Sequence, residues 1–450
     1  MAERAPAMLD APLAALEATA RFTVHGRVTR VIGQVIEASS MPLGVGEACR
    51  IAPDDHHGIL AQVVGFHERG ILLMPLGETE GVHPGAEVIP LGRSLFVGVG
   101  EGLIGRVLDG LGRPIQAGTR LGVTRRRPLT SEPPRPMDRP PIRQALATGV
   151  RAIDGLVTLG QGQRIGIMAG SGVGKSVLLG MIARQSSADV NVIALVGERG
   201  REVREFIERD LGPEGLRRSV VVAATGDQAA VVRAAGAQVA TAIAEYFRDS
   251  GRNVLLMMDS VTRVAMAWRE IGLAVGEPPT TKGYPPSVFA QLPRLLERAG
   301  TSARGSITGL YTVLVEGDDF NEPVADAARS ILDGHIVLSR KLAHARQFPA
   351  VDVLESVSRV RDQVIGPDHA EVANRFLKLE AAYRSHEDLI SVGAYKTGAD
   401  PDVDAALELR PAMLSFLRQG ATDHASLNES RAQLARLAAQ SAAPRNGGGS

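Results

Sequence analysis

Cysteine is almost absent from this chain of 450 residues, since Cys49 is the only one. A single cysteine excludes an internal disulfide and is typical of proteins that work in a reducing compartment. Long hydrophobic runs are also missing, as is the pattern of a signal peptide. We therefore expect a protein that neither spans a membrane nor is exported by a signal of its own.

The chain also lacks net charge, because 50 basic and 50 acidic side chains cancel. No bulk field would draw it to nucleic acid or to an anionic membrane, so we expect no nucleic-acid partner. Lysine is scarce while arginine is abundant, and a lysine within a motif is therefore less readily explained by composition. The length and the apolar content of 44% are typical of two or three globular domains with a large core.

The N-terminal part of the chain contains two segments of different sequence pattern. Residues 1–21 are rich in alanine, with leucines at helical spacing, and we expect a flexible segment that could form a partner-binding helix. In residues 22–95, Gly, Pro and Asp clusters separate short alternating or apolar runs, at 27–36, 61–66 and 70–75. That pattern predicts a small β-barrel domain.

After a proline-rich linker, 128–141, apolar strand patterns alternate with helical ones. The predicted strands are 164–168, 191–196, 219–224, 254–258 and 307–315. This alternation predicts that residues 96–367 form an α/β domain with a parallel sheet and helices on both faces. Helical patterns then follow at 370–383, 405–417 and 427–438. We expect a helical domain over residues 368–440 and a disordered tail over 441–450.

The most informative segment is a glycine-rich loop between an apolar strand pattern and a helical pattern. It comprises Ala169, Gly170, Ser171, Gly172, Val173, Gly174, Lys175 and Ser176. Strand, loop and helix in this order predict a phosphate-binding loop whose backbone N–H groups surround the β and γ phosphates of a nucleoside triphosphate. Lys175 would add a point charge there, and the Ser176 hydroxyl would ligate Mg²⁺. The strict pattern begins with Gly, whereas this loop begins with Ala169.

Two carboxylates are expected at the same edge of the sheet. The apolar run 254–258 ends in Asp259, where a carboxylate would hold the hydration shell of Mg²⁺. The run 191–196 delivers Glu198 to the C-terminal edge of the sheet, where open α/β sheets bind ligands. A carboxylate there can orient and polarise an attacking water. Considered alone, Glu198 could instead be a solvated acid in an ion-paired loop.

Four motifs resemble the family of rotary ATP synthase α and β subunits. They are Val-Leu-Asp-Gly-Leu-Gly-Arg-Pro (107–114), Gly-Glu-Arg-Gly-Arg-Glu-Val (197–203), Met-Asp-Ser-Val-Thr-Arg (258–263) and Phe-Pro-Ala-Val-Asp-Val-Leu-Glu-Ser-Val-Ser-Arg-Val (348–360). The resemblance implies a RecA-like domain with a P-loop and a parallel sheet, preceded by the small β-barrel and followed by the helical domain.

Within that family the chain is similar to the branch of flagellar type III protein-export ATPases. The loop that begins with Ala169 resembles this branch, and so does Asp-Leu-Ile-Ser-Val-Gly-Ala-Tyr-Lys-Thr-Gly-Ala-Asp-Pro (388–401). The resemblance covers the chain from Phe22 onward. It implies ATP and Mg²⁺ as ligands, with Lys175 and Ser176 binding phosphate and metal and Asp259 completing the metal shell.

The resemblance also implies catalytic roles for four residues and a nucleotide-binding role for Phe348. Glu198 would be the catalytic carboxylate, with Arg199 beside it, and Arg263 stands where the family keeps an arginine near the γ-phosphate. Phe348 matches the aromatic that stacks on adenine, although an ordinary core Phe is the alternative. Arg359 matches the arginine finger that a neighbouring subunit inserts, with a solvated arginine as the alternative.

A chain with both Glu198 and Arg359 can build every catalytic site from copies of itself, which implies a homohexameric ring with sites between subunits. The implied function is ATP hydrolysis that energises or primes flagellar type III protein export. Implied partners are a stator-like subunit at the N-terminal segment, a central stalk protein, export chaperone–cargo complexes and, peripherally, the membrane export gate. The implied location is the cytoplasm, at the inner face of the cytoplasmic membrane at the flagellar base.

Three alternatives stay open at this point. The ATPase of a virulence-type needle secretion system would share every catalytic residue. An RNA-translocating RecA-like hexamer shares the Gly-Glu-Arg element, but its barrel should carry a basic, aromatic RNA face, and this barrel is poor in both. A ring subunit that only binds nucleotide is disfavoured by Glu198, because non-catalytic α-type subunits carry Gln there.

Overall fold

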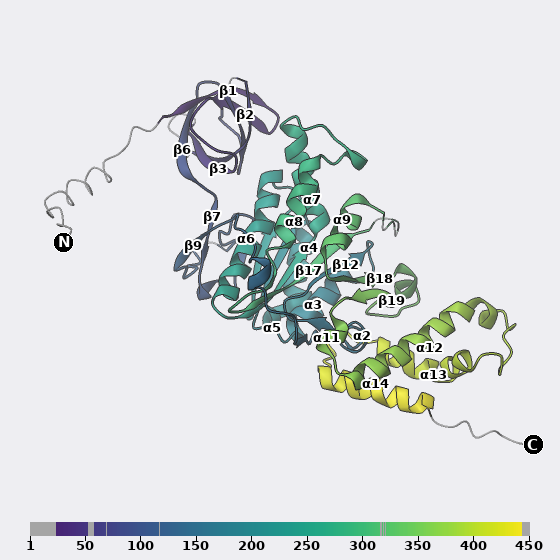
Figure 1. The fold of residues 1–450 in the computed structure, drawn as a ribbon. Coiled ribbons are helices and arrows are strands. Elements are labelled where there is room, and N and C mark those ends of the chain that lie inside the picture. The colour runs from purple at the N-terminus through teal and green to yellow at the C-terminus, as the bar shows by residue number, and fades with distance from the viewer. Residues whose placement is uncertain are drawn as a thin grey trace, which may run out of the picture. The chain divides into compact units, whose positions relative to one another are not determined.

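A computed structural model describes residues 24–52, 58–68, 70–116, 118–315, 317, 319 and 321–442. Its contacts divide the chain into two compact units, Met1–Leu95 and Phe96–Ser450 (Figure 1). The predicted N-terminal helix lies outside the described residues, and so does all of the predicted tail except residues 441–442, which belong to the last helix. Among the described residues, no helix combines the length and apolar character needed to cross a membrane.

The first unit contains the expected β-barrel. Six strands close it in the order β1-β2-β5-β4-β3-β6. They are β1 (Gly26–Ile32), β2 (Val35–Ser39), β3 (Glu47–Ala52), β4 (Ile59–His67), β5 (Gly70–Pro75) and β6 (Glu87–Ser94). The run 27–36 is a hairpin rather than one strand, because the chain reverses at Gly33, whose φ of 55° favours glycine.

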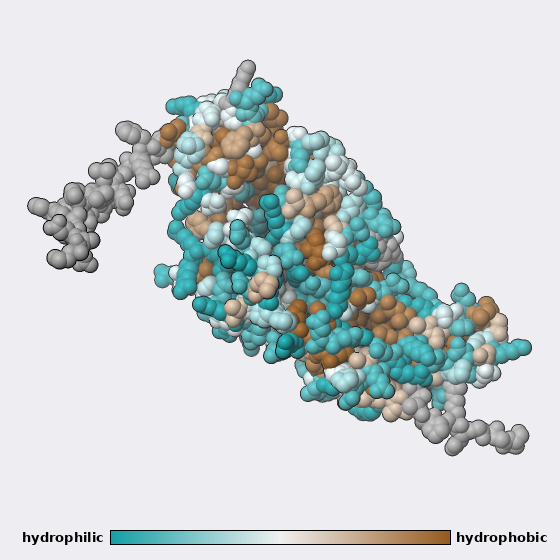
Figure 2. Space-filling model, viewed as in Figure 1, coloured by the Kyte–Doolittle hydropathy of each residue, from teal (hydrophilic) through white to brown (hydrophobic). Residues whose placement is uncertain are grey.

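Apolar side chains fill the barrel, among them Ile36, Ile51 and Leu73. Cys49 lies in the same core, where burial raises the pKa of its thiol to about 12 and keeps it uncharged. Some apolar residues stay exposed on the outside, including Phe66, and Figure 2 shows hydrophobic residues gathered over this unit.

The second unit is built on a nine-stranded sheet with the order β19-β18-β12-β17-β15-β13-β14-β8, and β16 pairs beside β17. Every predicted strand is present: β12 (Arg164–Ala169), β13 (Val190–Val196), β14 (Ser219–Ala224), β15 (Asn253–Asp259) and β17 (Ser306–Leu314). These five run parallel, and their residues are almost all buried. They therefore read as continuous apolar runs.

The sheet has four further strands, and two of them break the expected parallel pattern. The additional strands are β8 (Val107–Asp109), β16 (Gly300–Thr301), β18 (Gly334–Leu338) and β19 (Val351–Ser358). β19 runs antiparallel to β18, and β16 runs antiparallel to β17. The sheet is therefore mixed. The connection between β18 and β19 starts and ends at the C-terminal end of the parallel strands, since Leu338 pairs with Val351 on one side and with Ala169 of β12 on the other.

Helices accompany the strands of this unit; α6, for example, packs against β13, β14 and β15. The α-helices described before residue 367 are α2 (Arg151–Leu156), α3 (Lys175–Gln185), α4 (Gly200–Glu205), α5 (Gly212–Leu216), α6 (Ala230–Asp249), α7 (Val261–Ala274), α8 (Pro286–Leu296), α9 (Pro323–Ile331), α10 (Arg340–His344) and α11 (Arg361–Val364). The short strands outside the sheet and barrel are β7 (Phe96–Val99), β9 (Arg125–Pro128), β10 (Ala145–Leu146) and β11 (Leu159–Gly160).

Three C-terminal helices follow, each longer than predicted: α12 (Pro367–Ser391), α13 (Pro401–Leu417) and α14 (Leu427–Ala442). The extra residues lie at the helix ends; α13, for example, starts at Pro401 with the Asp400 carboxylate as N-cap. The helices share one hydrophobic core with the sheet unit, and a side chain on Gly155 of α2 would meet Phe416 at 2.7 Å. The domain boundary between residues 367 and 368 stays a prediction.

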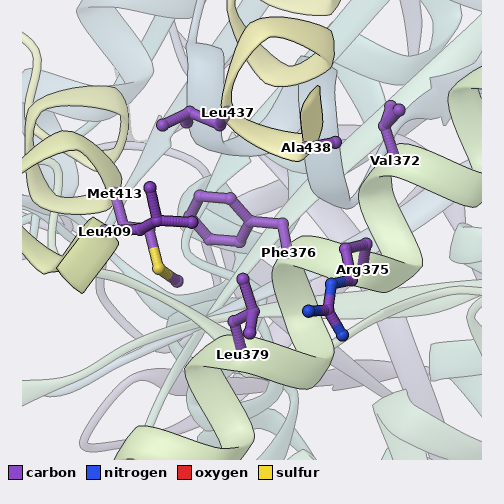
Figure 3. A pocket seen from close by; sticks show the side chains of 8 residues that line it. All are labelled: Val372, Arg375, Phe376, Leu379, Leu409, Met413, Leu437 and Ala438. Atoms are coloured by element: carbon purple, nitrogen blue, oxygen red, sulfur yellow. The ribbon is translucent and has the colours of Figure 1, made fainter. Parts of the chain in front are cut away.

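A small, mostly apolar hollow lies between these three helices, and the Phe376 ring forms part of its wall (Figure 3). The Phe376 and Phe416 rings are tilted against each other at a centroid distance of 5.5 Å. The hollow is lined by Val372, Arg375, Phe376, Leu379, Leu409, Met413, Leu437 and Ala438. Its lining marks the core that holds the helices together.

Candidate functional site

The glycine-rich loop connects β12, which ends at Ala169, to α3, which begins at Lys175. Gly172 and Gly174 have φ values of 79° and 89°, which residues with a side chain rarely adopt. The first N–H groups of α3 have no acceptors within the helix, and the helix dipole adds positive potential at this end. The loop is therefore built to surround an anionic group such as a phosphate.

A lysine and two carboxylates meet beside this loop. The Lys175 ammonium lies 2.5 Å from Asp259 Oδ1 and 3.6 Å from Glu198 Oε1. The carboxylates come from neighbouring strands: Asp259 ends β15 and pairs in register with Leu195 of β13, three residues before Glu198. The Thr312 hydroxyl of β17 donates to Asp259 Oδ1 at 2.7 Å and holds that carboxylate in place.

Glu198 is buried, and burial raises the pKa of its carboxyl to about 7. A hydrogen bond with Glu202 acts in the same direction, while Lys175 and Arg263 oppose the shift. A carboxyl with this pKa can exchange a proton near neutral pH.

Arg263 completes the group of charges. Its Nη2 lies 3.6 Å from Glu198 Oε2, and its Nη1 donates to the Gly197 carbonyl. A side chain on Gly197 would meet the Arg263 chain at 2.7 Å, so the arginine can cross the backbone there only because this residue is glycine. Ser260 caps α7 and fixes the first turn of the helix, on which Arg263 lies.

The oxygen ligands available to a metal ion are few. Within the described part of the chain, no group of three or more His, Cys, Asp or Glu residues could hold a metal ion. The Ser176 hydroxyl, on the second residue of α3, and the Asp259 carboxylate are hard oxygen donors of the kind that Mg²⁺ prefers. Two such donors fit a Mg²⁺ ion that keeps water and phosphate oxygens as its other ligands.

Phe348 lies beside the loop. Its side chain is 39% exposed, and a Cβ on Gly174 would lie 3.5 Å from the ring. The backbone N–H of Gln419, just beyond α13, donates to the Phe348 carbonyl at 2.9 Å. An exposed ring next to a phosphate-binding loop suits stacking on a base rather than a place in the core.

Two predicted site residues do not join this group within one chain. The Arg199 side chain is 84% exposed and pairs with Glu202 at 3.3 Å. Arg359 follows β19, and its N–H donates to the carbonyl of Asp333, whose own N–H donates to Arg164 at the start of β12. The loop begins at the other end of β12, five residues on, or about 17 Å away at the usual rise per residue.

Sequence reasoning missed Thr312 and Glu202, which contact the two carboxylates. Thr312 lies on β17 opposite Ile167 of β12, but its hydroxyl gave no signal in the sequence, because the same strand also carries Ser306, Thr308 and Tyr311. Glu202 gave no signal either, because an acid in the first turn of a helix is common.

The loop, the parallel strands and the two carboxylates define a P-loop nucleotide-binding protein. Family models agree: the nucleotide-binding domain of the ATP synthase alpha/beta family matches residues 149–358, and the β-barrel domain of that family matches 28–92. The T3SS EscN ATPase C-terminal domain matches residues 365–436.

Two curated relatives are similar over nearly the whole chain. The flagellum-specific ATP synthase of Bacillus subtilis is 57% identical over 426 residues, which are 94% of this chain and 97% of the relative. A type 3 secretion system ATPase of Xanthomonas euvesicatoria is 51% identical over 429 residues, covering 95% and 96%.

Solved structures agree. The assembled ATPase EscN from the enteropathogenic E. coli type III secretion system superposes with a TM-score of 0.87 at 46% identity, covering 92% of this chain and all of that one. EscN in complex with its central stalk EscO gives a TM-score of 0.86 at 45% identity with the same coverage. The chain belongs to the ATP synthase α/β family.

Proposed function

We propose that this protein is an ATPase that energises or primes flagellar type III protein export. The observation that carries the proposal is the meeting of Lys175, Glu198 and Asp259 at one edge of the sheet, beside the glycine-rich loop. Identity to a flagellum-specific ATP synthase, at 57%, supports the flagellar system over the needle system, whose ATPase relative is 51% identical.

The chemistry assigned to each group follows from its place. The loop N–H groups and the Lys175 ammonium bind the β and γ phosphates, and the Glu198 carboxylate accepts a proton from the water that attacks the γ-phosphate. Arg263 and Lys175 offset the negative charge that develops. When bound, Mg²⁺ supplies further charge neutralisation, and Ser176 and Asp259 are the residues that would hold it.

Arg359 is proposed to act on a neighbouring copy of the chain. Its exposure and its position at the opposite end of β12 from its own loop support a role at another subunit's nucleotide. A chain that supplies both pocket and finger suits a homohexameric ring. EscN, whose solved structures are described as assembled and as bound to a central stalk, supports self-association and a stalk partner.

The remaining partners and the location follow from the same family. We infer a stator-like subunit at the N-terminal segment, export chaperone–cargo complexes, and a peripheral contact with the membrane export gate. The protein would then act in the cytoplasm at the flagellar base. Deletion of the gene should abolish motility, whereas loss of effector secretion with normal motility would assign the protein to a needle system.

Mixed rings test the inter-subunit site. Glu198→Gln spoils a pocket but leaves the finger intact, and Arg359→Ala does the reverse, so each protein alone should be nearly inactive. Mixing the two should restore part of the activity, because some interfaces then pair an intact pocket with an intact finger. Mixed oligomers that form and stay inactive would contradict the proposal.

A further inference from the structure

A group of partly buried hydrogen bonds holds the backbone at Arg359. The Arg359 N–H donates to the Asp333 carbonyl at 3.0 Å. Asp333 is itself fixed to the first residue of β12: its N–H donates to the Arg164 carbonyl at 2.8 Å, and its carboxylate accepts from the Arg164 N–H at 3.0 Å. The Arg164 guanidinium donates to both oxygens of the same carboxylate, at 3.2 Å each.

The Gln163 side chain links Asp333, which accepts from the Arg359 N–H, to Ser358, which precedes Arg359 in the chain. This side chain is fully buried, and Nε2 donates to the Asp333 carbonyl and to the Ser358 hydroxyl, each at 3.1 Å. Its Oε1 accepts from the Gly160 N–H at 2.9 Å. Because a buried amide that loses its partners costs free energy, this bridge fixes where the chain leaves β19.

The side chain of Arg359 contrasts with its backbone. The residue is exposed, and within the described part of the chain its guanidinium makes no ion pair. A fixed backbone with a free, charged side chain is the arrangement expected of a residue that reaches into another subunit.

We propose that Gln163 and Asp333 are positioning residues for Arg359, so that β12 carries the phosphate-binding loop at one end and the support of the arginine finger at the other. The inference rests on the proposed role of Arg359 between subunits. It predicts that disturbing Gln163 damages the neighbour's site and spares the chain's own nucleotide pocket.

Gln163→Met keeps the size of the side chain and removes its hydrogen bonds. Asn191→Leu is the matched control, because the Asn191 amide is equally buried and donates to a carbonyl (Ala183) and a serine hydroxyl (Ser219) at 2.8 and 3.2 Å. Asn191 lies on β13 and has no contact with the finger. Gln163→Met should lower kcat about 10- to 100-fold, since a misplacement of about 1 Å can cost that much. Its affinity for a fluorescent ATP analogue should stay within twofold of wild type.

Mixing experiments assign the damage. Gln163→Met protein should recover activity when mixed with Glu198→Gln protein, whose finger is intact, and should not recover with Arg359→Ala protein. Asn191→Leu protein should not show this pattern. Asp333→Asn keeps the backbone carbonyl that accepts from Arg359 and weakens only the contact between the Asp333 carboxylate and Arg164. It should show the same mixing pattern as Gln163→Met with a smaller loss of kcat. It replaces Gln163→Met in this test if that protein is unstable.

Three outcomes would contradict the inference, and each points to a different cause. If Gln163→Met recovers with Arg359→Ala and not with Glu198→Gln, or loses nucleotide affinity, it acts on its own pocket and the positioning role is wrong. If Asn191→Leu follows the same pattern as Gln163→Met, the effect is general and the inference is also wrong. If Glu198→Gln and Arg359→Ala do not restore each other in mixed rings, the finger between subunits is itself refuted, and this inference falls with it.

Discussion

Glu198→Gln is the most direct test of the assigned chemistry, because it preserves the shape of the side chain and removes its charge. Lys175 and the glycine-rich loop are untouched, so nucleotide affinity should stay near the wild-type value. The proton acceptor is lost, and kcat should fall roughly 10²- to 10⁴-fold, the usual range for a positioned acid–base group. The variant should therefore bind ATP and fail to turn it over.

The raised pKa of Glu198 predicts the effect of pH on activity. Burial raises the pKa of this carboxyl from 4.5 to about 7. The ionised form is the base, so wild-type kcat/KM should fall as the pH drops through about 7, and the residual activity of the variant should lack this step.

The same shift predicts a change in stability. A raised pKa means that the fold disfavours the ionised carboxyl. The contribution of Glu198 to the free energy of unfolding therefore decreases as the pH rises from about 4.5 through about 7. The shift corresponds to roughly 3 kcal/mol. Above pH 7 the neutral glutamine avoids this cost, so the variant should unfold at a higher temperature than the wild type. Near pH 4.5 the difference should shrink.

Phosphate release over a range of MgATP concentrations, nucleotide titration and thermal unfolding, each across this pH range, measure these effects. Glu205→Gln on α4 is the matched control, since Glu205 is partly exposed and pairs with Arg209 at 3.0 Å. It should leave all three readouts unchanged. A kcat for Glu198→Gln within threefold of wild type, with the same pH profile, would refute the role of Glu198.

Lys175→Ala should weaken nucleotide binding and turnover together, because the ammonium stabilises charge in both the bound and the transition state; unchanged affinity in a titration would contradict its place at the phosphates. Activity per chain should rise with protein concentration, since each site needs two subunits, whereas constant activity while sedimentation shows only monomers would argue against the ring. Asp154→Ala should lower the free energy of unfolding by about 2–4 kcal/mol. The buried Asp154 carboxylate accepts from the N–H groups of Thr148 and Gly149, and both groups would lose their acceptor. Denaturant unfolding measures this change, and a loss below about 1 kcal/mol would show that water replaces the carboxylate.

The phosphate-binding loop could be predicted from the sequence because its physics is local. Eight consecutive residues set the backbone conformation, and the strand and helix on either side show in the apolar pattern. Asp259 and Glu198 were predictable for a related reason: each follows a buried strand, and parallel strands bring their C-terminal ends to one edge. The roles of Phe348 and Arg359 came from family resemblance, since nothing in their local sequence distinguishes them.

Only the tertiary structure decided which residues support those groups. Gln163 contacts Ser358, 195 positions along the chain, and Arg359 stands at the far end of β12 because β19 runs antiparallel. The direction and register of β19 depend on pairing between distant segments, which no local pattern of apolar residues encodes. The pKa of Glu198 likewise depends on burial by several elements at once. The sequence therefore determined the phosphate-binding loop, and long-range packing determined where each charged side chain lies relative to that loop.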